Sequence, residues 1–530
     1  MPADTLAALL LARAEDDRPA LLFEGRSWSW RAHVAECRRR AAWLRGRPHV
    51  GVLLDNVPEL VTLIGAAALS GQVIVALNPT RSPAELVRDA RAADVGLLVW
   101  DDPHGTAARA IAAALAVPCL RTEDLDGPGG RAPAGRRTPD ELVMLIFTSG
   151  TSGRPRAVRV TQRKIALPGL SLARMLGPAD VVYCSMPLFH SGALMAAYAP
   201  AVAAGAALVL KRRFSASNLL PDLREYGCTY LHYVGKALSY VLATEERGDD
   251  ADNPLRLAFG NEGSATATRR FAERFGCRVI DAFGSTETAL SIRPDPQAPP
   301  GSLGRLPDGV EIRSPVTGAR CAPARVEDGR LLNPDEAVGE LVNVRGTGLF
   351  DGYYNDPEAD AERIREGAYW SGDMAYADAA GHVFFAGRGT ERLRVDGENL
   401  AVAPIEEVLG QAPGVVEVAV YPVPDVAAGD QVMAAVVPGP AFEIDGFAAF
   451  IAGRTDLGRK AVPRYIRISG ELPHTSSHKI VKRVLAAECW HTTDPVHVRT
   501  GTGYRPLTAA DRAEIDAELA RNGRRTPRET

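Results

Sequence analysis

"IFTSGTSGRPRAV", residues Ile146 to Val158, joins an apolar run to a loop made almost wholly of Gly, Ser and Thr. The apolar run, Leu142 to Phe147, predicts a β-strand. Clusters of Gly, Ser and Thr are most often surface turns, but the stretch from Thr148 to Arg154 adds a guanidinium to its hydroxyls and glycines. Glycine lets the backbone approach an anion closely, and successive N–H groups can form an anion-binding concavity. The loop therefore predicts a phosphate site at the end of a strand.

This loop is not a Walker A motif, because no Gly-Lys-Ser/Thr follows Gly150 at the required spacing. A nucleotide site must then take its other parts from elsewhere in the chain. The sequence also lacks the G-x-S-x-G elbow of α/β-hydrolases, so it gives no support for a serine hydrolase.

Length and composition describe an ordinary globular protein of more than one domain. The 530 residues exceed what one hydrophobic core usually supports. Hydrophobic residues make up 46% and charged residues 24% of the chain, which is typical of soluble domains. The net charge of -4 gives no electrostatic case for a nucleic-acid partner.

Cysteine usage and the apolar segments favour a cytoplasmic protein with no transmembrane segment. The seven cysteines are odd in number and never form a C-x-x-C pair, which suits a reducing compartment. The N-terminal stretch lacks a basic region and predicts an amphipathic helix, not a signal peptide. The uncharged stretch from Gly192 to Leu210 is mostly alanine and is broken by Pro200 and Gly205, so it predicts a buried helix, a turn and a strand.

The order of the predicted elements indicates an α/β protein. Strand-like runs alternate with alanine- and leucine-rich helical patterns, which predicts parallel sheets covered by helices. We expect a large N-terminal domain over residues 1–386, which ends in a small β-rich subdomain, and a smaller, mobile C-terminal α+β domain over 387–530. The boundary is placed near Gly387–Glu391, and Leu507 to Asn522 predicts a last helix before a disordered basic tail.

Four further stretches supply chemistry that the loop lacks. "DAFGSTETA" places Glu287 after a Gly-Ser-Thr turn, where a carboxylate could hold Mg²⁺ beside phosphates. "YWSGDMAYAD" offers Asp373 as an acceptor for a ribose diol, and "FAGRGTERLRVDGENL" offers Arg388 and a glycine turn at Gly397. "LPHTSSHKIVKRVL" presents Lys479 after a polar loop. Each stretch alone is compatible with solvated surface. Only their order and spacing along the chain point to a common function.

In order and spacing these motifs resemble the adenylate-forming superfamily of acyl-CoA synthetases, firefly luciferase and peptide-synthetase adenylation domains. The resemblance covers nearly the whole chain. Within the superfamily, "YVGKALSYVLA", "LAFGNEGS", "FGSTE", "RVDGENL" and "HKIVKR" are most similar to FadD-type and fatty-acid transport protein-type acyl-CoA ligases. ATP, Mg²⁺ and coenzyme A are the cofactors that this resemblance implies.

The resemblance also implies a role for each matching residue. Thr148, Ser149, Gly150, Thr151, Ser152, Gly153 and Arg156 would line the loop that holds the β,γ-phosphates. Gly260, Asn261, Glu262 and Gly263, with Ala282, Phe283, Gly284 and Ser285, would flank the adenine and the acyl pocket. Thr286 and Glu287 would bind phosphate and Mg²⁺, and Asp373 and Arg388 would bind the ribose.

The resemblance further implies that Lys479 is the catalytic lysine of adenylation, assisted by Thr148 and Glu287, and that the Gly397 loop meets the pantetheine arm. His190 in "PLFHSG" matches a gate near the carboxylate site; its alternative interpretation is a packed core histidine.

Three features depart from the superfamily pattern, and the first is Asn399, which stands where many relatives have a basic residue. Arg156 stands where the phosphate loop usually carries lysine, which keeps the charge but changes the donor geometry. The hinge stretch "GRGTER" lacks the common aspartate at its pivot. His474 and His478 are four residues apart, but their Pro- and Ser-rich context indicates a loop, which argues against a metal-binding pair.

Two other functions stay open at this point. The chain could be an adenylating enzyme that loads a carrier protein, forms an amide or activates nitrite to diazotise an aromatic amine, since all of these keep the ATP machinery. It could also be a catalytically silent nucleotide-binding protein, although such a protein has no need of Lys479. The leading hypothesis is ATP-dependent activation of a carboxylic acid as acyl-AMP, followed by transfer to coenzyme A.

Overall fold

The computed structural model describes residues 4–47, 49–125, 136–149, 155–263, 265–295, 297–299, 301–327, 330–388, 392–395, 398–426, 430–454, 457, 460–474, 480–501 and 503–521. The chain divides into two compact units, which are described separately. The first comprises Met1–Gly263, Ala267–Ser291 and Gly346–Gly367, and the second comprises Ser264–Thr266, Ile292–Arg345 and Ala368–Thr530. The predicted boundary at 386/387 falls inside the second unit and stays a prediction.

The first unit contains two large sheets that are mainly parallel. In the described part of the chain, one has seven strands in the order β13 (Arg278–Asp281), β12 (Leu257–Asn261), β11 (Tyr230–Val234), β9 (Val181–Cys184), β10 (Ala207–Leu210), β1 (Pro19–Phe23) and β2 (Arg26–Ser29). The other has six strands in the order β6 (Cys119–Arg121), β5 (Val95–Trp100), β3 (His49–Leu53), β4 (Ile74–Ala76), β7 (Leu142–Ser149) and β8 (Pro155–Thr161). The sheets are mainly parallel, as expected, and each has one antiparallel edge strand, β2 and β8.

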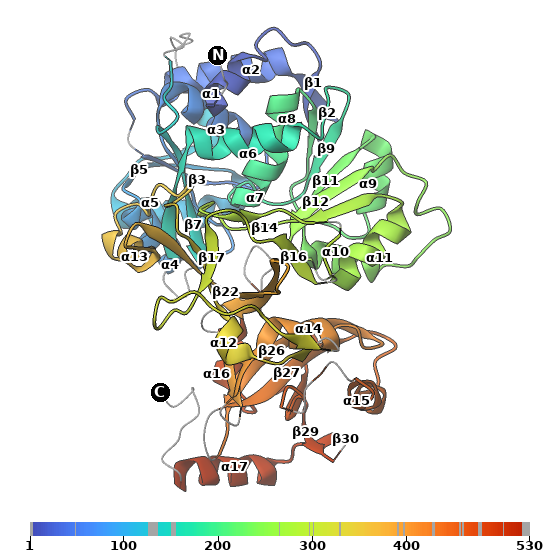
Figure 1. Ribbon diagram of the computed structural model, residues 1–530. Helices are drawn as coiled ribbons and strands as arrows, with labels where there is room; N and C mark the ends of the chain where they lie inside the picture. Colours follow the sequence, from blue (N-terminus) through green and yellow to red (C-terminus); the bar gives the residue numbers. More distant parts are fainter. Residues whose placement is uncertain are drawn as a thin grey trace. The chain divides into compact units, whose positions relative to one another are not determined.

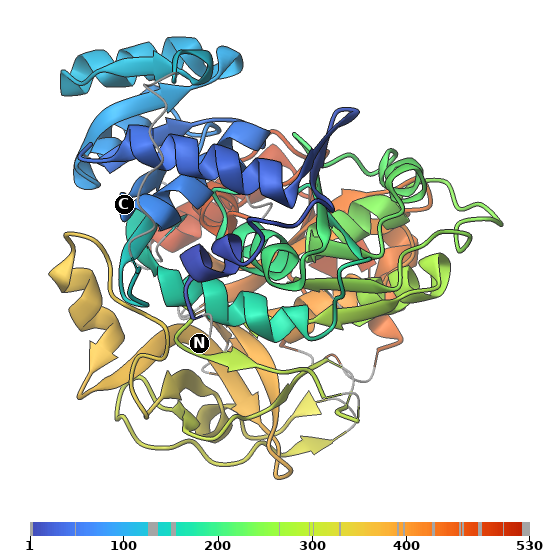
Figure 2. The ribbon, with the colours of Figure 1, turned by 90° about the horizontal axis from the view of Figure 1, so that it is seen from above.

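Helices cover these sheets, as the alternating pattern predicts. They are α1 (Leu6–Leu11), α2 (Trp30–Leu44), α3 (Pro58–Ser70), α4 (Pro83–Ala92), α5 (Gly105–Leu115), α6 (Gln162–Ala173), α8 (Ala199–Ala204), α9 (Leu219–Tyr226), α10 (Gly235–Leu242), α11 (Ala265–Phe275) and α13 (Pro357–Arg363). Helix α3 begins at a proline and ends at Gly71, which adopts φ 74. Figure 1 shows α2 beside α3 and α6 beside α8, and Figure 2 looks onto these helices from above.

The uncharged stretch from Gly192 to Leu210 forms helix, turn and strand, so the prediction for it is confirmed. It contains the short helix α7 (Ser191–Ala193), the π-helical segment η3 (Leu194–Tyr198), α8 and β10, with Gly205 in the left-handed region at φ 72. Its apolar side chains belong to the largest core of the unit, together with α1 and α3. Among the described residues, no helix is long and apolar enough to cross a membrane.

The second unit begins with the predicted β-rich subdomain. Strands β16 (Ser302–Arg305), β23 (His382–Arg388), β22 (Ala368–Ala377), β20 (Gly339–Asn343) and β17 (Val310–Arg313) form an antiparallel sheet. The smaller elements around it are β18 (Val326–Glu327), β19 (Arg330–Leu331) and α12 (Pro334–Ala337). Met374 and Tyr376 of β22 pack with Val338 and Ala386 in its small apolar cluster.

The rest of the second unit is the predicted compact α+β fold. The hairpin β24 (Arg392–Val395) and β25 (Glu398–Ala401) leads into α14 (Val402–Leu409). The sheet that follows has the order β26 (Val415–Pro424), β27 (Asp430–Pro438), β28 (Tyr465–Ile468), β29 (Val496–Thr500) and β30 (Gly503–Pro506). Helices α15 (Ile444–Ala452), α16 (Lys482–Glu488) and α17 (Ala509–Arg521) complete it. Figure 1 shows β26 and β27 side by side with α14 next to them. The tail predicted to be disordered lies outside the described residues.

Candidate active site

The Gly/Ser/Thr loop joins two antiparallel strands of the six-stranded sheet. Strand β7 brings the chain to Thr148, whose partner on β8 is Arg156, and Ser149 pairs with Pro155. Residues 150–154, which include Gly150, Thr151, Ser152 and Gly153, lie outside the described residues. The structure thus gives the predicted phosphate loop a rigid frame on both sides, and its role stays a prediction.

Arg156 is almost fully buried at the foot of this loop. Its side chain is 6% exposed, forms an ion pair with Glu362 of α13 and lies over the Tyr353 ring at 5.4 Å. Its Nη1 atom has no hydrogen-bond partner among the described residues. Arg156 is thus held by Glu362 and Tyr353, and its Nη1 is a buried donor next to the predicted phosphate loop.

Glu287 is held by groups from three separate parts of the first unit. The Tyr353 hydroxyl donates to Glu287 Oε1 at 2.9 Å. Burial raises the pKa of Glu287, but backbone and Tyr353 hydrogen bonds and the charge of Lys164 outweigh burial, so the pKa is lowered overall. Glu287 is thus an anion in a partly buried turn, and the next residue, Thr288, adopts a left-handed φ of 57, which is strained for a β-branched residue.

Lys164 is a residue of this site that the sequence argument did not identify. It lies near the start of α6 with 0% exposure, and its ammonium donates to the Arg159 carbonyl at 3.3 Å. The same ammonium lies over the Phe350 ring at 5.6 Å. Burial lowers its pKa to about 8, although the charges of Glu287 and Asp351 act in the opposite direction. A lysine followed by apolar residues at a helix start has no distinctive pattern, so no sequence signal could have found it.

The donor set around Glu287 fits Mg²⁺. A hard cation of this kind is usually bound by one or two carboxylates together with phosphate oxygens and water. Glu287 supplies an ionised carboxylate, and the hydroxyl of Thr286 lies one residue before it. Thr286 Oγ1 is 2.8 Å from Ser191 Oγ, so two hydroxyl oxygens lie at the same turn.

His190 stands at the start of the apolar helix that reaches this turn. It is the cap residue of α7, and its ring lies against Phe189 with centroids 4.6 Å apart. The next residue, Ser191, makes the contact to Thr286. The residue that follows the predicted gate residue thus contacts the predicted phosphate residue Thr286, and the gate role of His190 stays a prediction.

The predicted adenine segments meet at the carboxyl ends of β11, β12 and β13. Gly260 pairs with Asp281, and the Ala282 amide donates to the Gly260 carbonyl at 2.8 Å. Gly235 at the end of β11 must be glycine, because a Cβ there would lie 1.8 Å from the Glu262 carbonyl oxygen. In parallel sheets, ligands bind at this edge. The structure therefore brings the segments 260–263 and 282–285 together, and their roles beside the adenine and the acyl pocket stay predictions.

Asp281 is an unusual carboxyl at that edge. One of its oxygens, Oδ2, accepts hydrogen bonds from the Tyr233 hydroxyl and the Gly263 amide, both at 2.8 Å. Burial raises its pKa to about 6, even though these two bonds act to lower it.

In the second unit, Asp373 and Arg388 are brought together. They are paired across strands β22 and β23, and Asp373 is 5% exposed. The Asp373 amide donates to the Ser371 hydroxyl at 3.1 Å. The predicted ribose pair thus shares one position in the antiparallel sheet, while the side chain of Arg388 is outside the described part.

Lys479 and Gly397 both lie outside the described residues. The chain on either side of Lys479 is described, because His474 and Ile480 form an antiparallel bridge. Gly397 comes between the paired strands β24 and β25 in the sequence. His474 contacts Glu417 through its Nε2 atom at 3.2 Å. The metal pair with His478, against which the sequence argues, cannot be compared with this contact, because His478 lies outside the described residues.

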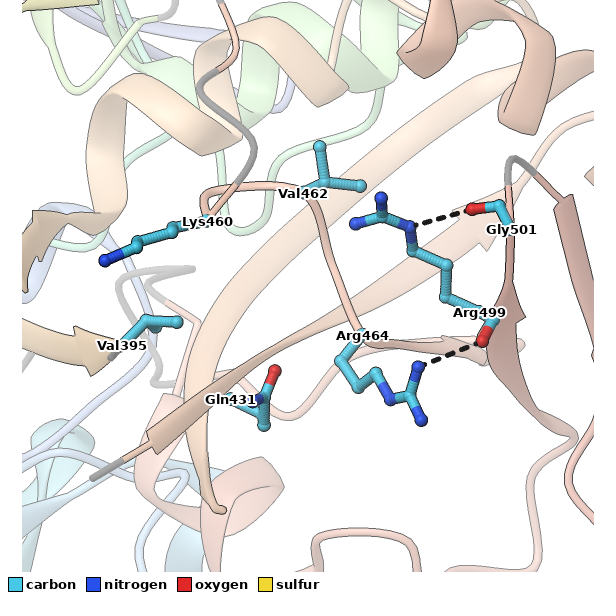
Figure 3. A pocket seen from close by; sticks show the side chains of 7 residues that line it. All are labelled: Val395, Gln431, Lys460, Val462, Arg464, Arg499 and Gly501. Atoms are coloured by element: carbon cyan, nitrogen blue, oxygen red, sulfur yellow. Dashed lines mark hydrogen bonds between the residues drawn. The ribbon is translucent and has the colours of Figure 1, made fainter. Parts of the chain in front are cut away.

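A cationic pocket of about 610 Å³ in the second unit was not anticipated from the sequence. Figure 3 shows the side chains that line it: Val395, Gln431, Lys460, Val462, Arg464, Arg499 and Gly501. Arg464 Nη1 donates to the Arg499 carbonyl at 3.1 Å, and Arg499 Nε donates to the Gly501 carbonyl at 3.2 Å. These bonds orient two guanidinium groups, of Arg464 just before β28 and of Arg499 in β29. Val395 is two residues from Gly397 in the sequence.

Comparison with known proteins gives the site its context. The sequence profile described as "AMP-binding enzyme" matches residues 11–354, and the profile described as "AMP-binding enzyme C-terminal domain" matches residues 404–479. The chain is 47% identical over 508 residues to the medium/long-chain-fatty-acid–CoA ligase FadD17 of Mycobacterium marinum, with 94% of this chain and 99% of that protein covered. It is 43% identical to the steroid-22-oyl-CoA synthetase of Rhodococcus jostii, with 98% of each chain covered.

Solved structures share the fold. The ATP-bound MatB of Rhodopseudomonas palustris has a TM-score of 0.79 at 24% identity, covering 91% of this chain and 98% of that one. The MenE protein of Bacillus subtilis in complex with ATP and a magnesium ion has a TM-score of 0.75 at 24% identity, covering 90% and 98%. These similarities give no support to nitrite and an aryl amine as substrates, the alternative that the motifs left open.

Proposed function

This chain belongs to the AMP-binding enzyme family and is an ATP-dependent, AMP-forming acyl-CoA ligase, and we propose that its substrate is a monocarboxylic acid with a large apolar tail. Two kinds of acid fit this description: a medium- or long-chain fatty acid, and the side-chain acid of a steroid. These are the substrates that the names of the two relatives above indicate. Seven free cysteines agree with the expected cytoplasmic location.

One observation carries the choice of an apolar acid. The Ser191 hydroxyl, 2.8 Å from Thr286 Oγ1, ties the turn of Thr286 and Glu287 to the start of an apolar helical segment. All five residues of the π-helical segment that follows, Leu194–Tyr198, are buried. π-helical segments occur frequently at functional sites. We infer that an acid whose carboxylate binds near this turn has its tail beside the apolar start of this segment, where Met195 and Ala196 are each 7% exposed.

We assign the site residues as follows. A carboxylate oxygen of the acid attacks the α-phosphorus of ATP, diphosphate leaves, and the thiol of coenzyme A then displaces AMP to form the thioester. The phosphate loop between β7 and β8 holds the diphosphate, with the buried donor Nη1 of Arg156 at its foot. Glu287 would hold Mg²⁺, which when bound offsets the charge of the leaving diphosphate. Lys479 stabilises charge during adenylation, and Asp373 accepts the ribose hydroxyls.

The cationic pocket of the second unit suits the nucleotide end of coenzyme A. That end carries a 3′-phosphate and a diphosphate, and guanidinium groups are well matched to phosphate oxygens. Arg464, Arg499 and Lys460 line the pocket, and Val395 leads into the Gly397 turn proposed to meet the pantetheine arm. Phosphates bound here would direct the thiol end of coenzyme A along that turn.

The acid class is tested with a series of straight-chain acids in a continuous assay for acyl-CoA. Each buried CH₂ contributes about 0.8 kcal/mol, so kcat/KM should rise by up to about fourfold per added carbon until the tail is fully enclosed. A steroid side-chain acid is tested in parallel. Small polar acids such as oxalate and sulfoacetate should be poor substrates. A preference for these small acids over every fatty acid and steroid acid would contradict the proposal.

The coenzyme A assignment is tested with Arg464→Met and Arg499→Met. Each change should raise the KM for coenzyme A and leave ATP–diphosphate exchange, which reports adenylation alone, at its original rate. Arg483→Met removes an exposed charge from α16 and serves as the matched control. An unchanged KM in the Arg464/Arg499 double variant would exclude this pocket as the nucleotide site.

A further inference from the structure

The segments that precede and follow Lys479 in the sequence pair with each other. We call the paired residues 473–474 and 480–481 the base. His474 and Ile480 pair as an antiparallel bridge, and the Val481 amide donates to the Pro473 carbonyl at 2.7 Å. Lys479 directly precedes Ile480 in the sequence.

One side of the base is attached to strand β26. His474 Nε2 lies 3.2 Å from Glu417 Oε1, and the two side chains are only 16% and 11% exposed. Because both side chains are largely withdrawn from water, little solvent competes for this contact.

The other side of the base is attached to helix α14. Lys482 is the first residue of α16, and its ammonium contacts both oxygens of Glu406, at 2.9 Å and 3.0 Å. Glu406 Oε1 also accepts a hydrogen bond from the Val420 amide at 2.7 Å. The two side chains are 15% and 21% exposed.

Helix α14 is itself firmly anchored. Its residues Ile405, Val408 and Leu409 are buried in the apolar core of this part of the unit, and the backbone amide of Val420 fixes the orientation of the Glu406 carboxylate. Glu406 therefore offers Lys482 a fixed carboxylate, while α14 does not need Lys482 in order to stay in place.

We propose that Lys482 and Glu406 are positioning residues for the adenylation step, and that their ion pair, together with the His474–Glu417 contact, fixes the base from which Lys479 reaches the reacting groups. This inference rests on the proposed function, in which Lys479 is the adenylation lysine. A lysine side chain has many rotamers, and a displacement of about 1 Å in a reacting group can cost on the order of 100-fold in rate. The ion pair ties Lys482, and with it the start of α16, to α14.

The thioester step should not depend on the pair. The Gly397 turn precedes α14 and is carried by the β24–β25 hairpin, whose Leu393 and Val395 pack in the apolar core with α14. The core holds that hairpin independently of Lys482. The two half-reactions should therefore respond differently to loss of the pair.

The test is Lys482→Met in the full-length enzyme, with the half-reactions measured separately. ATP–diphosphate exchange should fall by about 10- to 100-fold through kcat, with little change in the KM for ATP. Thioester formation from synthetic acyl-AMP and coenzyme A should keep its original rate. Lys482→Arg, which keeps the charge, should recover part of the exchange rate, and Glu406→Gln should reproduce the loss. Arg483→Met, one residue further along the same helix, should change neither step.

A double variant separates positioning from general damage. In a Lys479→Ala background, Lys482→Met should cause no further loss of exchange, because there is no lysine left to position. Equal losses in both half-reactions, a further loss in that background, or an unchanged exchange rate in Lys482→Met would each overturn the proposal. If Lys479→Ala alone keeps full exchange activity, the proposed role of Lys479 fails first, and that outcome is recognised without any Lys482 variant.

Discussion

Glu287 is the residue on which the proposed metal site depends. Its carboxylate is ionised despite partial burial, because the backbone, Tyr353 and Lys164 favour the charged form. In Glu287→Gln, a neutral amide replaces a hard anionic ligand. Loss of a group that only supports a ligand already costs about 10- to 100-fold in metal affinity, so we expect the Mg²⁺ concentration for half-maximal adenylation to rise by at least about tenfold. Activity is measured by ATP–diphosphate exchange across a Mg²⁺ series.

Binding is measured separately, as Mn²⁺ uptake in the presence of a non-hydrolysable ATP analogue. Glu358→Gln, an exposed change in the first turn of α13, is the matched control and should have no effect. An unchanged metal requirement and unchanged Mn²⁺ binding in Glu287→Gln would show that the metal is held elsewhere.

Asp281 gives a prediction about pH. Burial raises the pKa of this carboxyl to about 6, so the folded protein binds its proton more tightly than the unfolded chain does. The protonated Asp281 carboxyl stabilises the folded state. This stabilisation is complete below the ordinary carboxyl pKa of about 4 and is lost as pH rises through about 6. In Asp281→Asn, the new side chain would keep both hydrogen bonds through its amide oxygen but cannot ionise. Between about pH 4 and about pH 7, this variant should gain roughly 3 kcal/mol relative to the original protein, measured by denaturant unfolding. A constant difference across this range would contradict the raised pKa.

At this scale the sequence offers the motif residues but not the partners that hold them. Thr286, Glu287 and Asp373 stand in recognisable motifs, and the structure brings Thr286 against the His190 segment and pairs Asp373 with Arg388. Tyr353 and Lys164 act on Glu287 from distant positions in the chain. Contacts of that kind form only when sheets and helices pack together, so no local sequence pattern predicts them.

At the scale of elements, most strands and helices follow from local pattern. The strand before the Gly/Ser/Thr loop, the helix–turn–strand from Gly192 to Leu210 and the last helix α17 are all confirmed. The antiparallel return of β8 is the main difference within the six-stranded sheet. Its run from Pro155 to Thr161 follows a loop too short for a parallel crossover, which needs about a dozen residues or more. The short loop between β7 and β8 is therefore the sequence feature that predicts their antiparallel pairing.

The contact between α6 and α8 supports the apolar helix that leads from His190. A Cβ at Gly169 of α6 would lie 2.7 Å from the Ala199 Cβ and 2.9 Å from its carbonyl carbon, so Gly169→Ala must separate the helices. Overpacking of this kind costs roughly 1–3 kcal/mol, and the loss is measured by denaturant unfolding. Gly248→Ala is the control, because a Cβ there meets nothing within 4 Å. If both variants are equally stable, the close packing of α6 on α8 is incorrect.

At the scale of the whole molecule, composition and length predict more than one compact unit but not where the chain divides. The β-rich strands β16, β17, β20, β22 and β23 fall in the second unit, with the C-terminal α+β part. Strand pairing over long sequence distances decides such a division, and composition carries little information about it. The predicted hinge near residues 389–391 lies outside the described residues and stays a prediction.

The last prediction separates the two half-reactions at Gly397. If the C-terminal domain presents one face for adenylation and another for thioester formation, the Gly397 turn is needed only in the second step. A bulky side chain, as in Gly397→Leu, should then block acyl-CoA formation while ATP–diphosphate exchange continues near its original rate. The same variant should accumulate acyl-AMP, because the adenylate is formed but not consumed. The measurement is exchange rate, acyl-AMP and acyl-CoA in one mass-spectrometric time course, with and without coenzyme A. Equal loss of exchange and thioester formation would mean that the turn serves both steps, and a two-face arrangement of this domain would be wrong.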